Sequence, residues 1–234
     1  MGRGILVTGT DTGVGKTYVA ALLARRLRAE GVRVAPFKPV ESGCPAGPDG
    51  EPHPADAAAL RDAAAPGALL SSVCLYPLQA PLSPHLAAGR ERVRIDLGRI
   101  RAAVADGAAR ADVALVEGAG GIAVEIVAGY TFADLARDLA LPALVVAENR
   151  LGVLNHLRLT LSYLERAGVP LLGVVLNDRS AGESPARETN EAEVRRIAGS
   201  AFLGRLPFGP AGLPDRIFLR FREIVLSQEP SRFL

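Results

Sequence analysis

A glycine-rich segment near the N-terminus carries the strongest chemical signal in this sequence. Residues 9–17 read Gly-Thr-Asp-Thr-Gly-Val-Gly-Lys-Thr, directly after a short apolar run and directly before a helical pattern. Glycines let successive backbone N–H groups surround phosphate oxygens, and the start of a helix adds positive potential. We expect Lys16 to reach the β- and γ-phosphates of a nucleotide and the Thr17 hydroxyl to bind Mg²⁺. The segment therefore predicts a site for a nucleoside triphosphate.

Lysine is rare in this chain, and both lysines stand at candidate positions. Of 27 Lys and Arg residues, only Lys16 and Lys38 are lysines. A compact ammonium and a planar guanidinium suit different sites, so both lysines are candidates where a point charge is needed. Lys38 closes the expected strand 32–38, and strand ends of a parallel sheet face the same crevice as the phosphate loop. We expect Lys38 to face phosphate or a reacting carboxylate.

Acidic and small residues follow further expected elements. Glu117 comes directly after the apolar run 113–116, where phosphate-loop proteins place a carboxylate directed at a metal ion. Gly118, Ala119 and Gly120 follow it, and the glycines permit close approach of the backbone to a ligand. Asp56 lies at the start of an expected helix, where it is either a metal ligand or a partner of the helix dipole.

Short apolar runs alternate with helical patterns along the whole chain. The expected strands are 4–8, 32–38, 113–116, 143–147, 171–176 and 202–206, and the expected helices are 16–30, 54–65, 96–110 capped by Asp96, 131–139 capped by Thr131, 152–167 and 188–198. Buried strands separated by helices predict an α/β fold of the P-loop NTPase type, a mostly parallel sheet with helices on both faces. We expect one domain over 1–234, with loops at 43–54 and 207–214.

Composition narrows the class of protein. Of 234 residues, 49% are hydrophobic and 22% charged, which is a globular balance. The net charge of +2 does not favour nucleic acid or a membrane as a partner. Two cysteines, Cys44 and Cys74, cannot build a disulfide framework, and no export signal or apolar span is evident. We expect a cytoplasmic protein.

Three segments together resemble the dethiobiotin synthetase family. They are residues 9–17, Lys38-Pro-Val-Glu-Ser-Gly43 and Val116-Glu-Gly-Ala-Gly-Gly121; shorter matches are 82–85, 131–134, 151–156 and 176–178, all in family order from residue 5 to about 208. Five residues separate Gly9 from Gly15, one more than the general phosphate-loop pattern has, and this family shares that spacing. The resemblance implies an ATP- and Mg²⁺-dependent cyclo-ligase of biotin synthesis. It would join CO₂ to 7,8-diaminononanoate and close the ring of dethiobiotin, releasing ADP and phosphate.

The resemblance also implies roles for individual residues. The implied nucleotide contacts are Gly13, Val14, Gly15, Lys16, Thr17, Asp56, Glu117, Gly118, Ala119, Gly120, Asn177, Asp178, Leu206, Pro207 and Phe208. Asn177 would read adenine, the backbone at 206–208 would enclose the base, and Asp215 is the candidate for an acidic residue beside the ribose. The implied metal ligands are Thr17, Asp56 and Glu117.

The implied substrate site lies next to this nucleotide site. Its catalytic residues are Lys38, Lys16, Thr12 and Ser42, of which Thr12 and Ser42 hold carbamate and phosphoryl oxygens; further substrate contacts are Ser83, Pro84, Gly120 and Asn155. The family is a homodimer, so Asn155 of one chain would bind the substrate carboxylate in the site of the other. His85 and His156 have no metal-ligand spacing and are interpreted as structural.

Two other classes of phosphate-loop protein remain as alternatives. A ParA/MinD-like ATPase switch predicts an extra lysine near the start of the loop, where this chain has Asp11, and often a membrane helix, for which the amphipathic segment 216–226 is short. The ATP-binding part of a cobyrinate-type amide synthase would need a glutamine-hydrolysing domain, for which 234 residues leave no room. A turnover assay with the diamine distinguishes all three.

Overall fold

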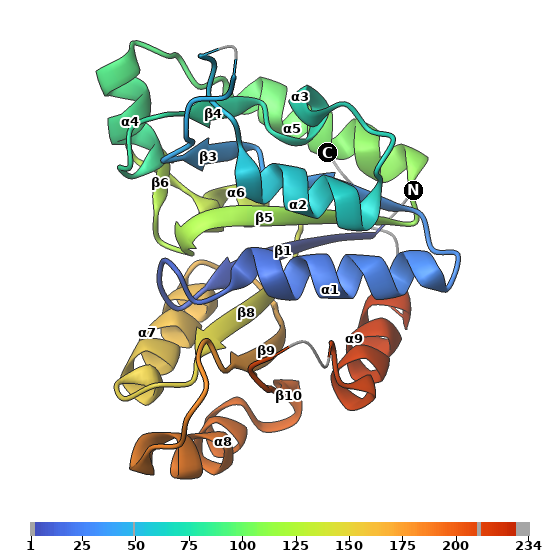
Figure 1. Ribbon diagram of the computed structural model, residues 1–234, viewed down its shortest axis with the longest axis vertical. Helices are drawn as coiled ribbons and strands as arrows, with labels where there is room; N and C mark the ends of the chain where they lie inside the picture. Colours follow the sequence, from blue (N-terminus) through green and yellow to red (C-terminus); the bar gives the residue numbers. More distant parts are fainter. Residues whose placement is uncertain (1–2, 49, 210–211, 228–234) are drawn as a thin grey trace.

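The computed structural model describes residues 3–48, 50–209 and 212–227, which are built around one parallel sheet (Figure 1). The six strands lie in the order β10-β9-β8-β1-β5-β2, and every neighbouring pair is parallel. Their bounds are β1 (Arg3–Gly9), β2 (Val34–Phe37), β5 (Val113–Gly121), β8 (Ala143–Glu148), β9 (Leu171–Asn177) and β10 (Phe202–Leu206). The P-loop NTPase-like α/β class predicted from the sequence is confirmed.

Helices cover both faces of this sheet, as the alternating pattern predicts. They are α1 (Lys16–Ala29), α2 (Ala55–Ala64), α3 (Leu70–Val73), α4 (Pro84–Glu91), α5 (Leu97–Arg110), α6 (Phe132–Asp138), α7 (Val153–Arg166), α8 (Pro185–Ala198), α9 (Asp215–Ser227) and the 3₁₀ turn Gly199–Ala201. In Figure 1, α1 and α2 lie in front of the sheet. No helix within the described ranges is long and apolar enough to cross a membrane.

Strand β1 illustrates how the two cores form. Side chains alternate between the faces of a strand. Ile5 and Val7 therefore pack in one cluster with α1, α2 and α9, whereas Leu6 packs in the other with α5, α6 and α7. All three side chains are fully buried. β1 has a paired neighbour on each side, β5 and β8, so the strand that leads into the glycine-rich loop lies at the centre of the molecule.

Strand β5 differs from its prediction in a way that affects the site. It continues through Glu117 to Gly121 instead of ending at Val116, so Glu117 lies inside a strand. Its register against β1 shifts there: Val7 pairs with Glu117, but Gly9 pairs with Gly121. The apolar run stopped at a charged residue, whereas hydrogen bonding carries the strand past it. The acidic side chain is tolerated because it has buried partners, described below.

Smaller differences concern short elements and helix ends. Two minor sheets pair β3 (Val40–Ser42) with β4 (Tyr76–Leu78) and β6 (Glu125–Val127) with β7 (Tyr130–Thr131). Strands of two or three residues carry too little periodicity to be predicted. β2 ends before Lys38, and Pro54 precedes α2 as its N-cap instead of lying in its first turn. The expected caps Asp96 and Thr131 are confirmed, each accepting a backbone N–H of its helix.

Gly107 lies where α5 packs tightly against β2, the strand that leads to Lys38. A Cβ at Gly107 would lie 2.3 Å from Cζ of Phe37 in β2. We predict that Gly107→Ala lowers the free energy of unfolding by about 1–3 kcal/mol through overpacking, against the ordinary gain of about 1 kcal/mol from replacing a helical glycine. Gly89→Ala in α4 is the control, because no atom lies within 4 Å of its Cβ position. Urea unfolding of both variants tests this, and a Gly107→Ala variant as stable as Gly89→Ala would contradict it.

Candidate functional site

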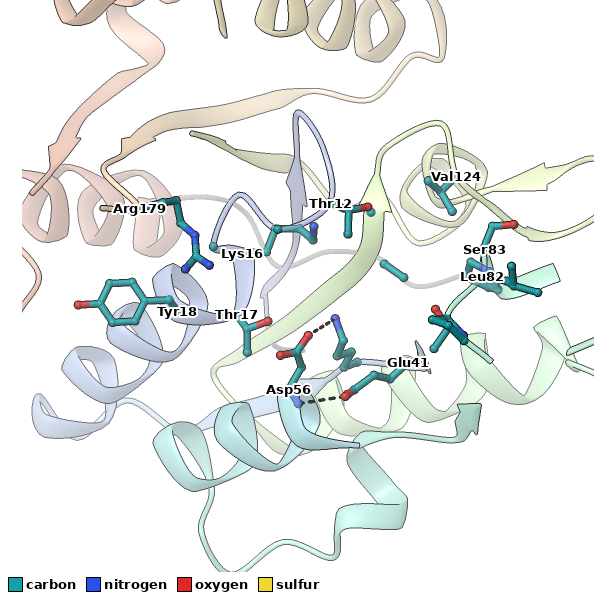
Figure 2. Close-up of a pocket in the computed structure, with 18 residues that line it drawn as sticks. Thr12, Lys16, Thr17, Tyr18, Glu41, Asp56, Leu82, Ser83, Val124 and Arg179 are labelled. Atoms are coloured by element: carbon teal, nitrogen blue, oxygen red, sulfur yellow. Dashed lines mark hydrogen bonds and ion pairs between the residues drawn. The ribbon is translucent and has the colours of Figure 1, made fainter. Parts of the chain in front are cut away.

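A cavity of about 630 Å³ opens at the carboxyl edge of the sheet, between the glycine-rich loop and the layer built by β3 and α4 (Figure 2). The predicted residues that line it are Thr12, Gly13, Gly15, Lys16, Thr17, Lys38, Ser42, Asp56, Ser83, Pro84, Ala119 and Gly120. Tyr18 and Arg179 lie at one end of the cavity, and Leu82 and Ser83 lie at the other. Residues from five separate parts of the sequence therefore meet in one space, as their positions at strand ends predict.

The glycine-rich loop has the backbone conformation that its composition predicts. Gly13 and Gly15 have φ of 76° and 92°, which favours glycine. A side chain at Gly15 would also lie 2.3 Å from the Asn177 amide nitrogen. Lys16 is buried, and its ammonium donates to the Asp11 carbonyl at 3.2 Å. Burial, together with the charge of Lys38, lowers the pKa of Lys16 to about 8.

Lys38, Glu117 and Thr17 form a buried polar cluster behind the loop. The Lys38 ammonium and the Thr17 hydroxyl both donate to Oε1 of Glu117, each at 2.7 Å. Glu117 is fully buried, and its other oxygen, Oε2, has no hydrogen-bond partner within the described structure. Burial alone would lower the pKa of Lys38, but the carboxylates of Glu117 and Asp56 outweigh it and hold that pKa above its ordinary value. Lys38 therefore keeps its charge in this buried position.

Asp56 is brought to this cluster by a residue that the sequence did not single out. Its Oδ2 lies 3.5 Å from the Lys38 ammonium. Glu41, in β3, accepts the backbone N–H groups of Asp56 at 3.0 Å and of Ala57 at 2.9 Å, and so fixes the first turn of α2 (Figure 2). Burial raises the pKa of Glu41, against the effect of these two N–H donors. No sequence pattern signals such a contact, because this helix cap comes from another element instead of from the residue before the helix.

A second cavity of about 200 Å³ adjoins the first and contains Asn177, Asp178 and Phe208. Asn177 donates to the Val14 carbonyl at 2.9 Å, and its Oδ1 is buried without a partner among the described residues. Both oxygens of Asp178 already accept hydrogen bonds, from Asn149 at 2.7 Å and from Arg205 at 2.8 Å. Asn177 is thus free to contact a ligand through one atom, whereas Asp178 belongs to a buried network.

Several predicted residues do not line either cavity. Val14, Glu117, Gly118, Leu206 and Pro207 do not appear among the lining residues, and Val14 and Leu206 are buried. Asn155 is exposed on α7. Asp215 begins α9, where it pairs with Arg26 at 2.8 Å, and it does not face the second cavity. Conversely, Tyr18, Glu41, Val124 and Arg179 line the first cavity and were not predicted.

Comparison with known proteins agrees with this geometry. Residues 3–212 match a family model described as an AAA domain. The chain is 44% identical over 208 residues to an ATP-dependent dethiobiotin synthetase of Anaeromyxobacter dehalogenans (strain 2CP-C), covering 89% of this chain and 91% of that relative. It is 38% identical to the enzyme of the same name from Aromatoleum aromaticum, over 94% of this chain and 97% of the relative. The chain belongs to the dethiobiotin synthetase family.

Solved structures of more distant proteins share the fold. The cell division ATPase MinD of Pyrococcus furiosus superposes with a TM-score of 0.58 at 19% identity, over 96% of this chain and 98% of that one. A ParA family ATPase of Chlorobium tepidum gives 0.54 at 16% identity, over 97% and 91%. At identities this low, the similarity shows only that the fold is shared. The family assignment rests on the dethiobiotin synthetase relatives.

The cysteines and histidines of this dethiobiotin synthetase family member take no part in the cluster. Cys44 and Cys74 are buried free thiols, and burial raises their pKa values to about 11 and about 12. Such thiols stay protonated and are poor nucleophiles. His85 lies behind Ser83, with its ring nitrogens 3.3 Å from the Ser83 hydroxyl and 3.4 Å from Glu125.

We predict that Lys38 and Glu117 are coupled in their contributions to the free energy of unfolding. Lys38→Met leaves a buried carboxylate without its counter-charge, which costs about 3–5 kcal/mol. Adding Glu117→Gln removes that charge, so the double variant should be more stable than Lys38→Met alone. Lys16→Met is the matched control, because Lys16 forms no ion pair with a described carboxylate. Urea unfolding of the wild type, Lys38→Met, Glu117→Gln, the double variant and Lys16→Met measures the coupling, and additive effects of the two single substitutions would contradict it.

Proposed function

We propose that this chain catalyses the ATP-dependent synthesis of dethiobiotin from 7,8-diaminononanoate and CO₂, with release of ADP and phosphate, as a step of biotin synthesis. The observation that carries the proposal is the shared cavity, in which the phosphate-loop Lys16 and the buried Lys38 face the same space as Ser42 and Ser83. The near full-length identity to enzymes named for this reaction supports it. Two buried thiols agree with a reducing cytoplasm.

The residues provide what this chemistry requires. The nitrogen of one amine forms a bond to the carbon of CO₂ and loses a proton to solvent, which gives a carbamate anion. Lys38 and Lys16 stabilise this anion, and Thr12 and Ser42 hold it through their hydroxyl groups. A carbamate oxygen then attacks the γ-phosphorus of ATP, and ADP leaves. The second amine attacks the carbonyl carbon of the resulting anhydride, loses a proton and expels phosphate as the ring closes. In such a phosphoryl transfer, positioned positive charges contribute most of the rate enhancement.

The donor set beside Lys38 fits a magnesium ion. Thr17 and Asp56 present oxygens at the cavity, and Glu117 holds a buried carboxylate oxygen without a hydrogen-bond partner in the described structure. The Thr17 hydroxyl donates a hydrogen bond to Glu117, so the lone pairs of the Thr17 oxygen are available to a cation. Oxygen ligands with one or two carboxylates are what Mg²⁺ prefers beside phosphates. Bound there, Mg²⁺ would neutralise charge on the transferring phosphoryl group.

A homodimer accounts for the exposed surface of α7. Leu151 before the helix is 83% exposed and Leu159 within it is 62% exposed, and Tyr163 lies nearby on the same helix, exposed as well. Apolar side chains on one exposed helix favour a protein partner. Asn155 lies on this helix, away from the cavity of its own chain, where it would reach the substrate carboxylate of a second chain.

The reaction class is tested directly. We predict that the purified protein with Mg·ATP, bicarbonate and 7,8-diaminononanoate forms dethiobiotin, with one phosphate released for each ring closed. Mass spectrometry of the product and a phosphate assay measure the two together. Omission of the diamine is the control. Phosphate release that is independent of the diamine would contradict the proposal and favour an ATPase switch.

The metal ligands are tested by titration of activity with magnesium. Asp56→Asn and Glu117→Gln keep size but remove charge, so we predict a higher Mg²⁺ concentration at half-maximal activity and a lower rate at saturation. Asp62→Asn is the matched control, because Asp62 lies on the same helix as Asp56 and pairs only with the neighbouring Arg61 among the described residues. Midpoints and rates equal to those of the control would exclude both carboxylates from metal binding.

A further inference from the structure

The boundary between the two cavities is formed by two side chains that no sequence motif indicated. Tyr18 and Arg179 line both the larger cavity, which holds Lys16, and the smaller one, which holds Asn177. Tyr18 is tied in place, since its hydroxyl donates to the Gly209 carbonyl at 3.3 Å. Figure 2 shows both side chains at the end of the pocket beyond Lys16. A ligand that occupies both cavities must pass these two residues.

Arg179 is a cation without a partner inside the described structure. It follows β9 directly after Asp178 and is exposed, with no hydrogen bond or ion pair to any described residue. The neighbouring arginines are occupied: Arg187 donates to the carbonyls of Ser180 and Asn149, and Arg205 pairs with Asp178. The Arg179 stem nevertheless has a defined place, because its Cδ lies 3.2 Å from the Cβ position of Gly15 in the phosphate loop.

The balance of charge in the site calls for such a residue. Lys38 is already held by the carboxylates of Glu117 and Asp56. That leaves Lys16 as the lysine free of ion pairs at the described cavity, against a nucleotide that carries several negative charges. A planar guanidinium matches phosphate oxygens with two parallel N–H bonds.

We propose that Arg179 binds the α-phosphate of ATP and thereby joins the phosphate-loop cavity to the base cavity. The assignment rests on the proposed ATP site. With the β- and γ-phosphates at Lys16 and the base at Asn177, the α-phosphate lies between them, which is where Arg179 borders both cavities. Arg179 acts as a nucleotide-binding residue, separate from the groups that face the carbamate.

The test measures nucleotide binding by titration calorimetry, without turnover. Arg179→Ala should weaken the binding of ATP, ADP and AMP by the same factor, roughly tenfold or more for a lost charge-assisted contact. Unchanged binding of AMP would place the contact on the β-phosphate and contradict the proposal. Adenosine, measured by competition, should bind both proteins equally. Arg179→Lys should lose less nucleotide affinity than Arg179→Ala, because lysine keeps the positive charge although it lacks the planar guanidinium. Arg25→Ala is the matched control, since Arg25 is exposed on α1 and lines neither cavity.

Each other outcome overturns a defined part of the argument. Unchanged ATP affinity in Arg179→Ala removes Arg179 from the nucleotide site. An equal loss for adenosine assigns Arg179 to the base, and a loss for ATP but not ADP assigns it to the γ-phosphate; both contradict the α-phosphate contact. Failure of the wild-type protein to bind ATP would instead overturn the proposed function itself.

Discussion

The buried ion pair between Lys38 and Glu117 is the interaction on which the site depends. It joins the residue after β2 to the middle of β5, and the Thr17 hydroxyl adds the start of α1 to the same carboxylate oxygen. Charges this far from water persist only when they are paired and hydrogen-bonded. The pair thus requires the strands to be in register before the cluster exists, so fold and site form together.

The side of the cavity lined by Ser42 and Ser83 is built differently from the side lined by the glycine-rich loop. Ser42 and Glu41 come from β3, in a two-stranded sheet outside the central one, and Ser83 precedes α4. Glu41 connects this layer to the central cluster, because its carboxylate caps α2 and so places Asp56 beside Lys38. One carboxylate therefore holds two parts of the site in a fixed relation.

The sequence predicted the site residues whose positions follow from motifs and from the order of the strands. It did not predict the residues whose roles depend on tertiary contacts. Lys38 was found because charged residues at strand ends of a parallel sheet converge on one edge. Lys16 was found from the phosphate-loop motif, and Asn177 from the resemblance to the family. Glu117 was placed after its strand, since an apolar run says nothing about a charged residue that has buried partners. Glu41 lies inside the recognised segment 38–43 but was given no role, and Arg179 lay outside every recognised segment, because a cap from another element and a boundary between cavities exist only in three dimensions.

The central position of β1 has a consequence for how the protein opens. Both faces of this strand are covered and both edges are paired, so its amide protons exchange with solvent only when the whole domain unfolds. The short strands β3 and β4 have one partner each, and local opening reaches them at a lower free energy. The loop that begins at Gly9 is thus anchored in the most protected part of the molecule, while the opposite wall of the cavity is built on a sheet of only two short strands.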